Sequence, residues 1–306
     1  MKILILLRWF PFLGGTESIS VSLANQLAEG DADIFIFGQK LPGVNVDFEL
    51  AEGVSVVTVD EPLSPENTCR VIRRLNIDYV LFQCPFPAQL AIAEAIVKST
   101  DARLFVTLHD DPLHAMAAQW PVKANSSRLS LVVKRMAWPL YRLWADNRGK
   151  RVMSRYIRSA DRLILLSPAY ERALSEALNL PEECRRKLIS IPNFLPESAF
   201  PQETAAKRKE MVYVGRVVEL QKRLSRLVRI WKMFEERHDD WTLRIVGDGD
   251  DLDSLKRYAA DLEVGGISFE GYSCDVRSFL KPASVVVLVS DSEGLPMSLI
   301  EAMAEG

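Results

Sequence analysis

The sequence predicts an α/β protein with two domains, each built on a doubly wound parallel sheet. Two observations support this prediction. Short apolar runs repeatedly alternate with a loop and an amphipathic helical segment, which is the pattern of parallel strands joined by crossover helices. The chain of 306 residues also exceeds the size at which a single hydrophobic core usually stops growing. We therefore expect two cores.

Each expected strand is a continuous run rich in β-branched residues and leucine, as in strands that helices cover on both faces. In the first half these runs lie at residues 2–7, 33–37, 55–59, 79–82, 104–108, 162–166 and 188–191. In the second half they lie at residues 211–214, 242–246, 267–269 and 284–289. The two groups indicate one sheet per domain.

A proline-rich segment separates the two groups of strands. Residues 192–209 contain Pro192, Pro196 and Pro201, followed by a charged run. This composition fits either a hinge or an ordinary surface loop, and the fresh strand-helix alternation that follows favours the hinge. We expect the domains to span residues 1–195 and 196–306.

The composition is that of a folded globular protein, with 48% hydrophobic and 26% charged residues. A net charge of -3 gives no support for a nucleic-acid partner. The four cysteines are far apart and form no CxxC pair, which favours a reducing cytoplasm over a zinc site or a disulfide framework. No apolar run approaches about 18 residues, which excludes a membrane-spanning helix.

The first loop follows the first strand directly and contains Gly14 and Gly15. Two glycines at a strand-to-helix turn allow the backbone to approach a ligand, and the helix expected over residues 18–29 would offer its N-terminal amides to a phosphate. The spacing is neither GxGxxG nor a P-loop, which disfavours a dinucleotide enzyme or an NTPase. The alternative is a tight turn with Thr16 as the helix cap.

His109 follows the expected strand at residues 104–108, where open α/β sheets bind ligands. It is the best imidazole candidate in the chain. The alternative is a structural role, in which His109 caps the strand or pairs with Asp110.

The second domain opens with a strand that ends in Gly215 and Arg216, and Lys222 follows six residues later. Two cations near a crevice could neutralise a diphosphate. Cleavage of a bond between a sugar and a diphosphate leaves negative charge on the leaving group, and fixed cations lower that barrier. The alternative is a solvated basic helix start, which is also the simplest interpretation of Arg223, Arg226 and Arg229.

Two later strands also lead into glycine turns. Gly247 follows the strand at residues 242–246 and is consistent with a simple turn. Gly294 lies in the loop before a helix expected over residues 297–304, with Glu293 in that loop and Glu301 in the helix. Two carboxylates so placed could grip hydroxyls at separate points of one ligand. Alternatively, Glu293 pairs with the helix dipole and Glu301 is a surface residue.

Together these motifs resemble glycosyltransferase family 4, whose members are retaining enzymes of the GT-B fold with two Rossmann-like domains. The resemblance rests on GGTE, LHDD, VGR with QKR, VGDGD, FEGY and SDSEGLPMSLIEAMAEG, in this order. The last block is the most specific, because it carries the family's glutamate pair, Glu293 and Glu301. The similarity is strong over residues 211–306 and weaker over residues 1–192.

The resemblance implies that a hexose-type sugar moves from a nucleoside-diphosphate donor to a hydroxyl of a glycan or lipid-linked glycan, with retention and without a metal or cofactor. Residues 1–195 would bind the acceptor, and residues 196–306 the donor. The implied catalytic residues are His109, Glu293, Arg216 and Lys222. The implied donor-binding residues are Gly15, Gly247, Gly271, Tyr272, Gly294, Leu295 and Glu301.

Individual roles follow from the same resemblance. Arg216 and Lys222 would hold the diphosphate, while Glu293 and the backbone of Gly294 and Leu295 would contact the donor sugar. Glu301 would bind the ribose hydroxyls, and His109 would touch the sugar near its reacting carbon. Gly15 would approach the phosphate or the acceptor, and the turn at Gly271 and Tyr272 would lie near the nucleobase. Two alternatives remain: a nucleotide-sugar epimerase on the same fold, and a non-catalytic nucleotide-sugar-binding module.

Family members normally continue beyond the EAMAEG helix with a further strand and several helices. The resemblance therefore implies that the second domain is truncated at Gly306. The expected consequence is a second sheet short of strands and a 306-residue chain that is unstable or inactive.

Residues 120–158 are strongly basic, with ten positive residues and the single acidic residue Asp146. The interleaved aromatic residues are Trp120, Trp138, Tyr141 and Trp144. This combination is typical of a helix at an anionic membrane surface, and it predicts a cytoplasmic protein that is peripheral on the inner face of the membrane. Equally, the aromatic side chains could pack into the first domain while the arginines are solvated.

Overall fold

The computed structural model describes residues 1–12, 14–44, 46–83, 85–116, 128–195 and 206–306, with the backbone alone for residues 128–141. The chain forms two compact units, Met1–Asn193 and Phe194–Gly306. Their division falls within the predicted hinge, two residues before the expected boundary at 195/196. Pro196 and Pro201 lie outside the described residues.

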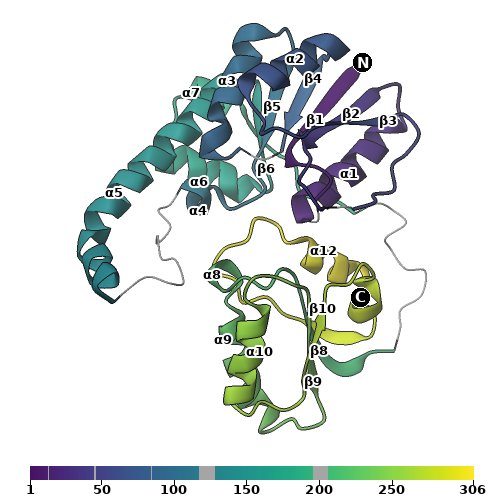
Figure 1. Cartoon of the computed structure of the whole chain (residues 1–306), viewed down its shortest axis with the longest axis vertical. Coiled ribbons are helices and arrows are strands. Elements are labelled where there is room, and N and C mark those ends of the chain that lie inside the picture. Colours follow the sequence, from purple (N-terminus) through teal and green to yellow (C-terminus); the bar gives the residue numbers. More distant parts are fainter. Residues whose placement is uncertain (13, 45, 84, 117–127, 196–205) are drawn as a thin grey trace. The chain divides into compact units, whose positions relative to one another are not determined.

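The first unit contains a parallel sheet of seven strands in the order β3-β2-β1-β4-β5-β6-β7 (Figure 1). Its strands are β1 (Lys2–Trp9), β2 (Asp33–Gln39), β3 (Val54–Val59), β4 (Tyr79–Phe82), β5 (Arg103–Thr107), β6 (Arg162–Leu165) and β7 (Leu188–Ser190). The strand order reverses between β1 and β4, which makes their carboxyl ends the topological switch point of this sheet.

Helices join the strands of the first unit and cover the sheet (Figure 1). They are α1 (Gly15–Ala28), α2 (Pro65–Leu75), the 3-10 helix η1 (Pro87–Gln89), α3 (Leu90–Ser99), α4 (Pro112–Met116), α5 (Arg128–Ser159), α6 (Pro168–Leu178) and α7 (Glu182–Arg185). Strand β1 shows why both faces need covering: Leu4 and Leu6 belong to one buried cluster, whereas Ile5 and Leu7 belong to another. Alternation of side chains along a strand sends them to opposite faces.

The second unit contains a parallel sheet of four strands in the order β10-β9-β8-β11. Its strands are β8 (Arg208–Val214), β9 (Thr242–Val246), β10 (Ile267–Gly271) and β11 (Ala283–Val286). Its helices are α8 (Glu219–Lys222), α9 (Leu224–Glu235), α10 (Leu252–Asp261), α11 (Arg277–Leu280) and α12 (Met297–Ala304). Trp231 of α9 is buried in the core of this unit, and its indole N–H donates to the carbonyl of Gly265 at 2.9 Å.

The predicted fold class and the positions of the strands are confirmed. Several element ends differ; β8, for example, begins at Arg208, three residues before the expected residue 211. Helix α1 begins at Gly15, with Gly14 as its N-cap and no capping side chain, so the alternative in which Thr16 caps the helix is wrong. The last strand ends at Val286, before the expected residue 289, although the amide of Val287 still donates to the carbonyl of Val212 at 2.9 Å.

The C-terminal part of α5 packs onto the first unit. Met153, Tyr156 and Ile157 are buried, and the Tyr156 hydroxyl donates to the carbonyl of Phe86 at 2.8 Å. Arg155 forms two hydrogen bonds of 2.8 Å with Glu94 of α3. Trp120 lies outside the described residues, as do the side chains of Trp138 and Tyr141, so the packing alternative for these aromatic residues stays a prediction.

Candidate functional site

The turn after β8 carries Gly215 and the exposed Arg216. The buried Tyr213 underlies this turn, since its hydroxyl donates to the carbonyl of Arg216 at 2.9 Å. Burial and the nearby Glu293 carboxylate raise the pKa of Tyr213, while Arg216 lowers it. The phenol therefore stays a neutral donor. The charges of Arg216 and Glu293 both lie close enough to affect its pKa.

Lys222 and Glu293 form an ion pair, with Lys222 Nζ 2.6 Å from Glu293 Oε1. Both side chains are largely shielded from solvent, at 15% and 21% exposure. The family resemblance implies that Lys222 contacts the diphosphate and Glu293 the sugar of one donor molecule. The structure brings them together at the junction of α8 and the loop before α12.

That loop is fixed to α8 and α9 by further contacts. The amide of Asp291 donates to the carbonyl of Gln221 at 3.0 Å. The Asp291 carboxylate accepts from Arg223 at 2.5 Å and from Arg226 at 3.1 Å. The hydrogen bond from Arg223 contributes most to a lowered pKa of Asp291. The interpretation of Arg223 and Arg226 as merely solvated is therefore wrong, because both hold the loop that carries Glu293.

Gly247 has a packing role that the sequence motif did not reveal. Its φ is +141°, and a Cβ added there would lie 1.9 Å from the carbonyl oxygen of Gly215. Its amide donates to the carbonyl of Gly271 at 2.7 Å. The turn after β9 thus packs directly against the turns after β8 and β10, which requires a residue without a side chain. Tyr272, next to Gly271, is 56% exposed.

Gly294 and Leu295 continue the loop from Glu293 to α12 and are partly buried. Glu301 lies within α12 and is also partly buried. Burial raises the pKa of Glu301, because the charged form loses hydration. The interpretation of Glu301 as an ordinary surface residue does not fit this burial.

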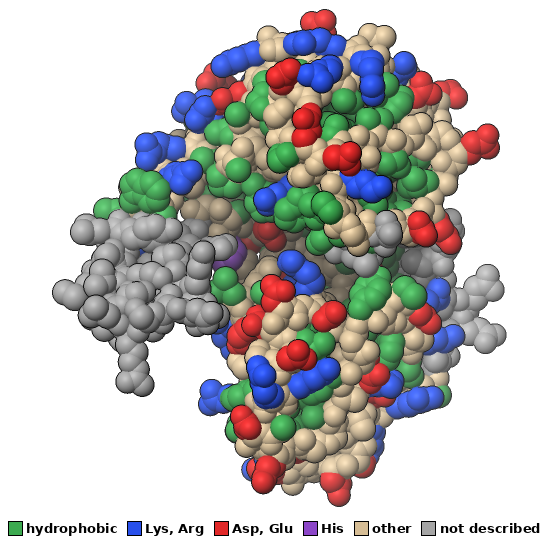
Figure 2. Space-filling model, viewed as in Figure 1, with side chains coloured by type: hydrophobic (Ala, Val, Ile, Leu, Met, Phe, Trp, Pro, Cys, Tyr) green, Lys and Arg blue, Asp and Glu red, His purple; other side chains and the backbone are tan. Residues whose placement is uncertain are grey.

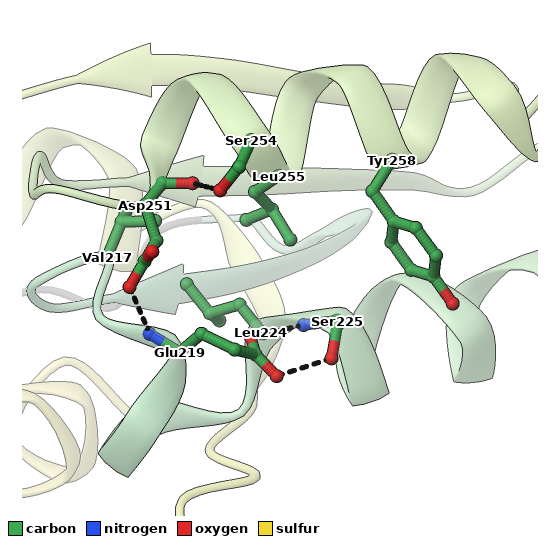
Figure 3. A pocket seen from close by; sticks show the side chains of 8 residues that line it. All are labelled: Val217, Glu219, Leu224, Ser225, Asp251, Ser254, Leu255 and Tyr258. Carbon is green, nitrogen blue, oxygen red and sulfur yellow. Dashed lines mark hydrogen bonds between the residues drawn. The ribbon is translucent and has the colours of Figure 1, made fainter. Parts of the chain in front are cut away.

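Figure 3 shows a small pocket between α10 and the start of α9. Two of its carboxylates have partners within the pocket: Glu219 accepts from the amide and hydroxyl of Ser225, and Asp251 accepts from the amide of Glu219 at 2.8 Å. Leu255 and Tyr258 line the remainder. These hydrogen bonds join α8 to α9 and to the start of α10, and they hold in place the short helix α8 that ends in Lys222.

The two candidates of the first unit lie at separate loops of its sheet. Gly15 begins α1, and a Cβ added there would meet no atom within 4 Å, so packing does not demand a glycine at this position. His109 follows β5, and its Nε2 lies 2.7 Å from Oε1 of Gln83, which follows β4. Burial lowers the pKa of His109 to about 4, so the ring is neutral at neutral pH.

Sequence reasoning missed Gln83 and Tyr213. Gln83 carried a usable signal, because it is a polar residue directly after a buried strand, the same criterion that selected His109. Tyr213 lies inside an apolar strand and looks like an ordinary core residue, so only its hydrogen bond to Arg216 shows its role.

Among the described residues, no group of three or more His, Cys, Asp and Glu side chains is arranged to hold a metal ion. Within the same residues, no helix is both long and apolar enough to cross a membrane.

Comparisons with known proteins find glycosyltransferases. Residues 196–306 match the family described as glycosyl transferases group 1. Over these residues, the second unit is similar to group 1 glycosyltransferases. An uncharacterized glycosyltransferase of Haemophilus influenzae is 25% identical over 299 residues, which cover 96% of this chain and 75% of that protein. The lipopolysaccharide 1,6-galactosyltransferase of Escherichia coli is 25% identical over 177 residues, which cover 56% of this chain and 46% of that enzyme.

Solved structures show the same GT-B architecture. A mutant of TarM from S. aureus, in complex with fondaparinux, alpha-GlcNAc-glycerol and UDP, has a TM-score of 0.71 at 10% sequence identity, over 99% of this chain and 84% of that chain. This likeness shows the fold. The glycosyltransferase relatives favour sugar transfer over the epimerase and the binding-module alternatives.

Proposed function

We propose that the chain transfers a hexose-type sugar from a nucleoside-diphosphate donor to a hydroxyl of a glycan or lipid-linked glycan, with retention, as in glycosyltransferase family 4. The ion pair between Lys222 and Glu293 carries this proposal. It joins a residue expected at the diphosphate to a residue expected at the sugar, within a unit that matches group 1 glycosyltransferases. Residues 1–195 would supply the acceptor side and residues 196–306 the donor side.

The cations would act on the leaving group. A lysine ammonium has three donors, so Lys222 could keep Glu293 and also bind a phosphate oxygen. Arg216, held at its carbonyl by Tyr213, would offer a planar fork of N–H donors to the other phosphate. As the bond between the sugar and the diphosphate breaks, both cations would stabilise the growing negative charge. No metal or cofactor is part of this proposal.

The carboxylates would bind hydroxyls. Glu293, oriented by Lys222, would accept hydrogen bonds from hydroxyls of the donor sugar, and the amides of Gly294 and Leu295 would donate to oxygen atoms of the same sugar. Glu301 would accept from the ribose, since its partial burial strengthens hydrogen bonds from hydroxyl groups. The turn at Gly271 and Tyr272, which packs on Gly247, would lie beside the nucleobase of the donor. His109 and Gly15 would contribute from the first unit.

The decisive experiment measures transfer with a panel of nucleotide sugars and follows the anomeric configuration of the product by NMR. The second unit has a buried core of its own around Trp231 and Leu243, so we expect transfer with retention rather than the inactive chain that the resemblance alone implies. Lys222→Met should lower kcat/KM at least about a hundredfold, as expected for loss of a group that stabilises transition-state charge. Lys256→Met, at an exposed lysine of α10, is the matched control. Donor conversion without acceptor would instead indicate an epimerase, and inverted product would remove the retaining mechanism.

The described part of α5 supports peripheral membrane contact as part of this function. Arg142, Arg148, Lys150, Arg151 and Arg158 are basic residues of this part. Two large apolar side chains are exposed beside them, Leu143 at 63% and Trp144 at 52%. Figure 2 shows the basic side chains along this helix. Such a surface suits anionic headgroups, and it would place the enzyme at the inner face of the membrane, near a lipid-linked acceptor.

Co-sedimentation with liposomes tests this contact. We expect binding to vesicles with anionic lipid and little binding to zwitterionic vesicles, with the difference reduced by salt. Charge reversal of Arg148, Lys150 and Arg151 to glutamate should abolish binding. The control reverses Arg70, Lys98 and Arg172, which belong to α2, α3 and α6. Equal binding to both vesicle types would remove the membrane proposal and leave sugar transfer untouched.

A further inference from the structure

Gln83 and His109 meet at the carboxyl edge of the first sheet, because they follow neighbouring strands. Strands β4 and β5 are paired in parallel. Just past the end of β4, the amide of Gln83 still donates to the carbonyl of Leu6 in β1 at 3.0 Å, at the switch point of the sheet. The amide of Leu108, next to His109, donates to the carbonyl of Ile164 at 2.9 Å. Backbone hydrogen bonds to β1 and β6 therefore fix the chain at Gln83 and next to His109.

The hydrogen bond between the two side chains defines the state of the imidazole. Gln83 is only 4% exposed, and its Oε1 lies 2.7 Å from His109 Nε2. An amide oxygen can only accept, so Nε2 must carry the proton. In a neutral ring the proton then leaves Nδ1 with a lone pair, and Nδ1 becomes the acceptor. His109 itself keeps partial exposure.

We propose that Gln83 is a positioning residue that fixes the orientation and the Nε2–H tautomer of His109, so that Nδ1 accepts a hydrogen bond from a hydroxyl of the donor sugar. This inference rests on the proposed function. Burial keeps the ring neutral above a pKa of about 4, and only a neutral ring has the acceptor that a hydroxyl needs. A partner that orients a functional histidine commonly selects its tautomer in this way.

Nitrogen-15 NMR tests the tautomer independently of activity. The chain contains three histidines, so His109 can be assigned by comparison with His109→Gln. We expect Nε2–H in the wild type at pH 7, and mixed tautomers in Gln83→Leu. Gln83→Glu keeps an acceptor toward Nε2 and should keep the tautomer. Gln89→Leu is the matched control, because Gln89 is also buried and its Oε1 has no partner among the described residues.

Kinetics then test the role in transfer. We expect Gln83→Leu to lower kcat/KM for the nucleotide sugar at least about tenfold, whereas Gln89→Leu should not. An Nδ1–H tautomer in the wild type would overturn the proposal, and so would a Gln83→Leu variant with altered tautomers and unchanged kcat/KM. Wild-type protein with the expected tautomer but without any transfer activity would refute the proposed function instead. Thermal unfolding of each variant identifies loss of folding.

Discussion

At the scale of single residues, the Tyr213 hydroxyl is the support of Arg216. Tyr213→Phe removes one hydrogen bond to the carbonyl of Arg216, and we expect a loss of about 1 kcal/mol in the free energy of unfolding. The released turn should also bind nucleoside diphosphates several times more weakly, because Arg216 loses its fixed position. Chemical denaturation and calorimetric titration with UDP or GDP measure the two effects.

Tyr258→Phe is the matched control, because Tyr258 is half-buried in the same unit and lines the pocket beside α10 rather than the turn at Arg216. It should change neither quantity. If Tyr213→Phe bound nucleotide as tightly as the wild type, the supporting role of Tyr213 would be wrong.

Residue types alone reveal part of the candidate site. Lys222 and Glu293 stand out because they are charged residues close to glycine turns that follow strands, and the structure pairs them. Gln83 and Tyr213 do not, because their roles depend on which side chain or carbonyl each one meets in space. The sequence also could not show that Gly247 is needed for packing against Gly215, since any tight turn can contain a glycine.

At the scale of elements, α5 approaches α4 closely at Gly149. A Cβ added there would lie 2.1 Å from the carbonyl oxygen of Met116. Gly149→Ala should therefore destabilise the protein by about 1–3 kcal/mol, although alanine is the better helix former by about 1 kcal/mol. Urea denaturation measures the change. Gly30→Ala is the control, since the nearest atom to an added Cβ there is 3.6 Å away.

A Gly149→Ala variant as stable as the wild type would show that α4 and α5 can move apart without loss of stability.

Hydrophobic periodicity predicts the positions of the strands better than it predicts the ends of the elements. Strand positions followed from apolar runs, because burial on both faces leaves little choice of residue. The ends of α1 and β11 did not, because helix and strand ends are set by local hydrogen bonds such as that of Val287.

At the scale of the whole molecule, the two units should respond to pH in opposite directions. In the first unit, the folded state lowers the pKa of His109 from 6.5 to about 4, so the unfolded state binds more protons within that window. The contribution of His109 to stability is complete above pH 6.5 and is lost as the pH falls toward 4. In the second unit, burial raises the pKa of Glu301 above 4.5. The contribution of Glu301 to the stability of the folded state therefore decreases as the pH rises above 4.5, the pKa of Glu301 in the unfolded chain.

Thermal unfolding of the wild type, His109→Gln and Glu301→Gln at about pH 5, 6.5 and 8 tests this contrast. The melting temperature of His109→Gln relative to the wild type should rise as the medium becomes more acidic, because glutamine does not take up a proton. The relative melting temperature of Glu301→Gln should rise as the medium becomes more alkaline, because the buried charge is gone. His238→Gln and Glu236→Gln, at exposed positions, are the control variants. If both test variants followed the wild type in parallel across this range, neither group would be held in the protonation state that its burial implies.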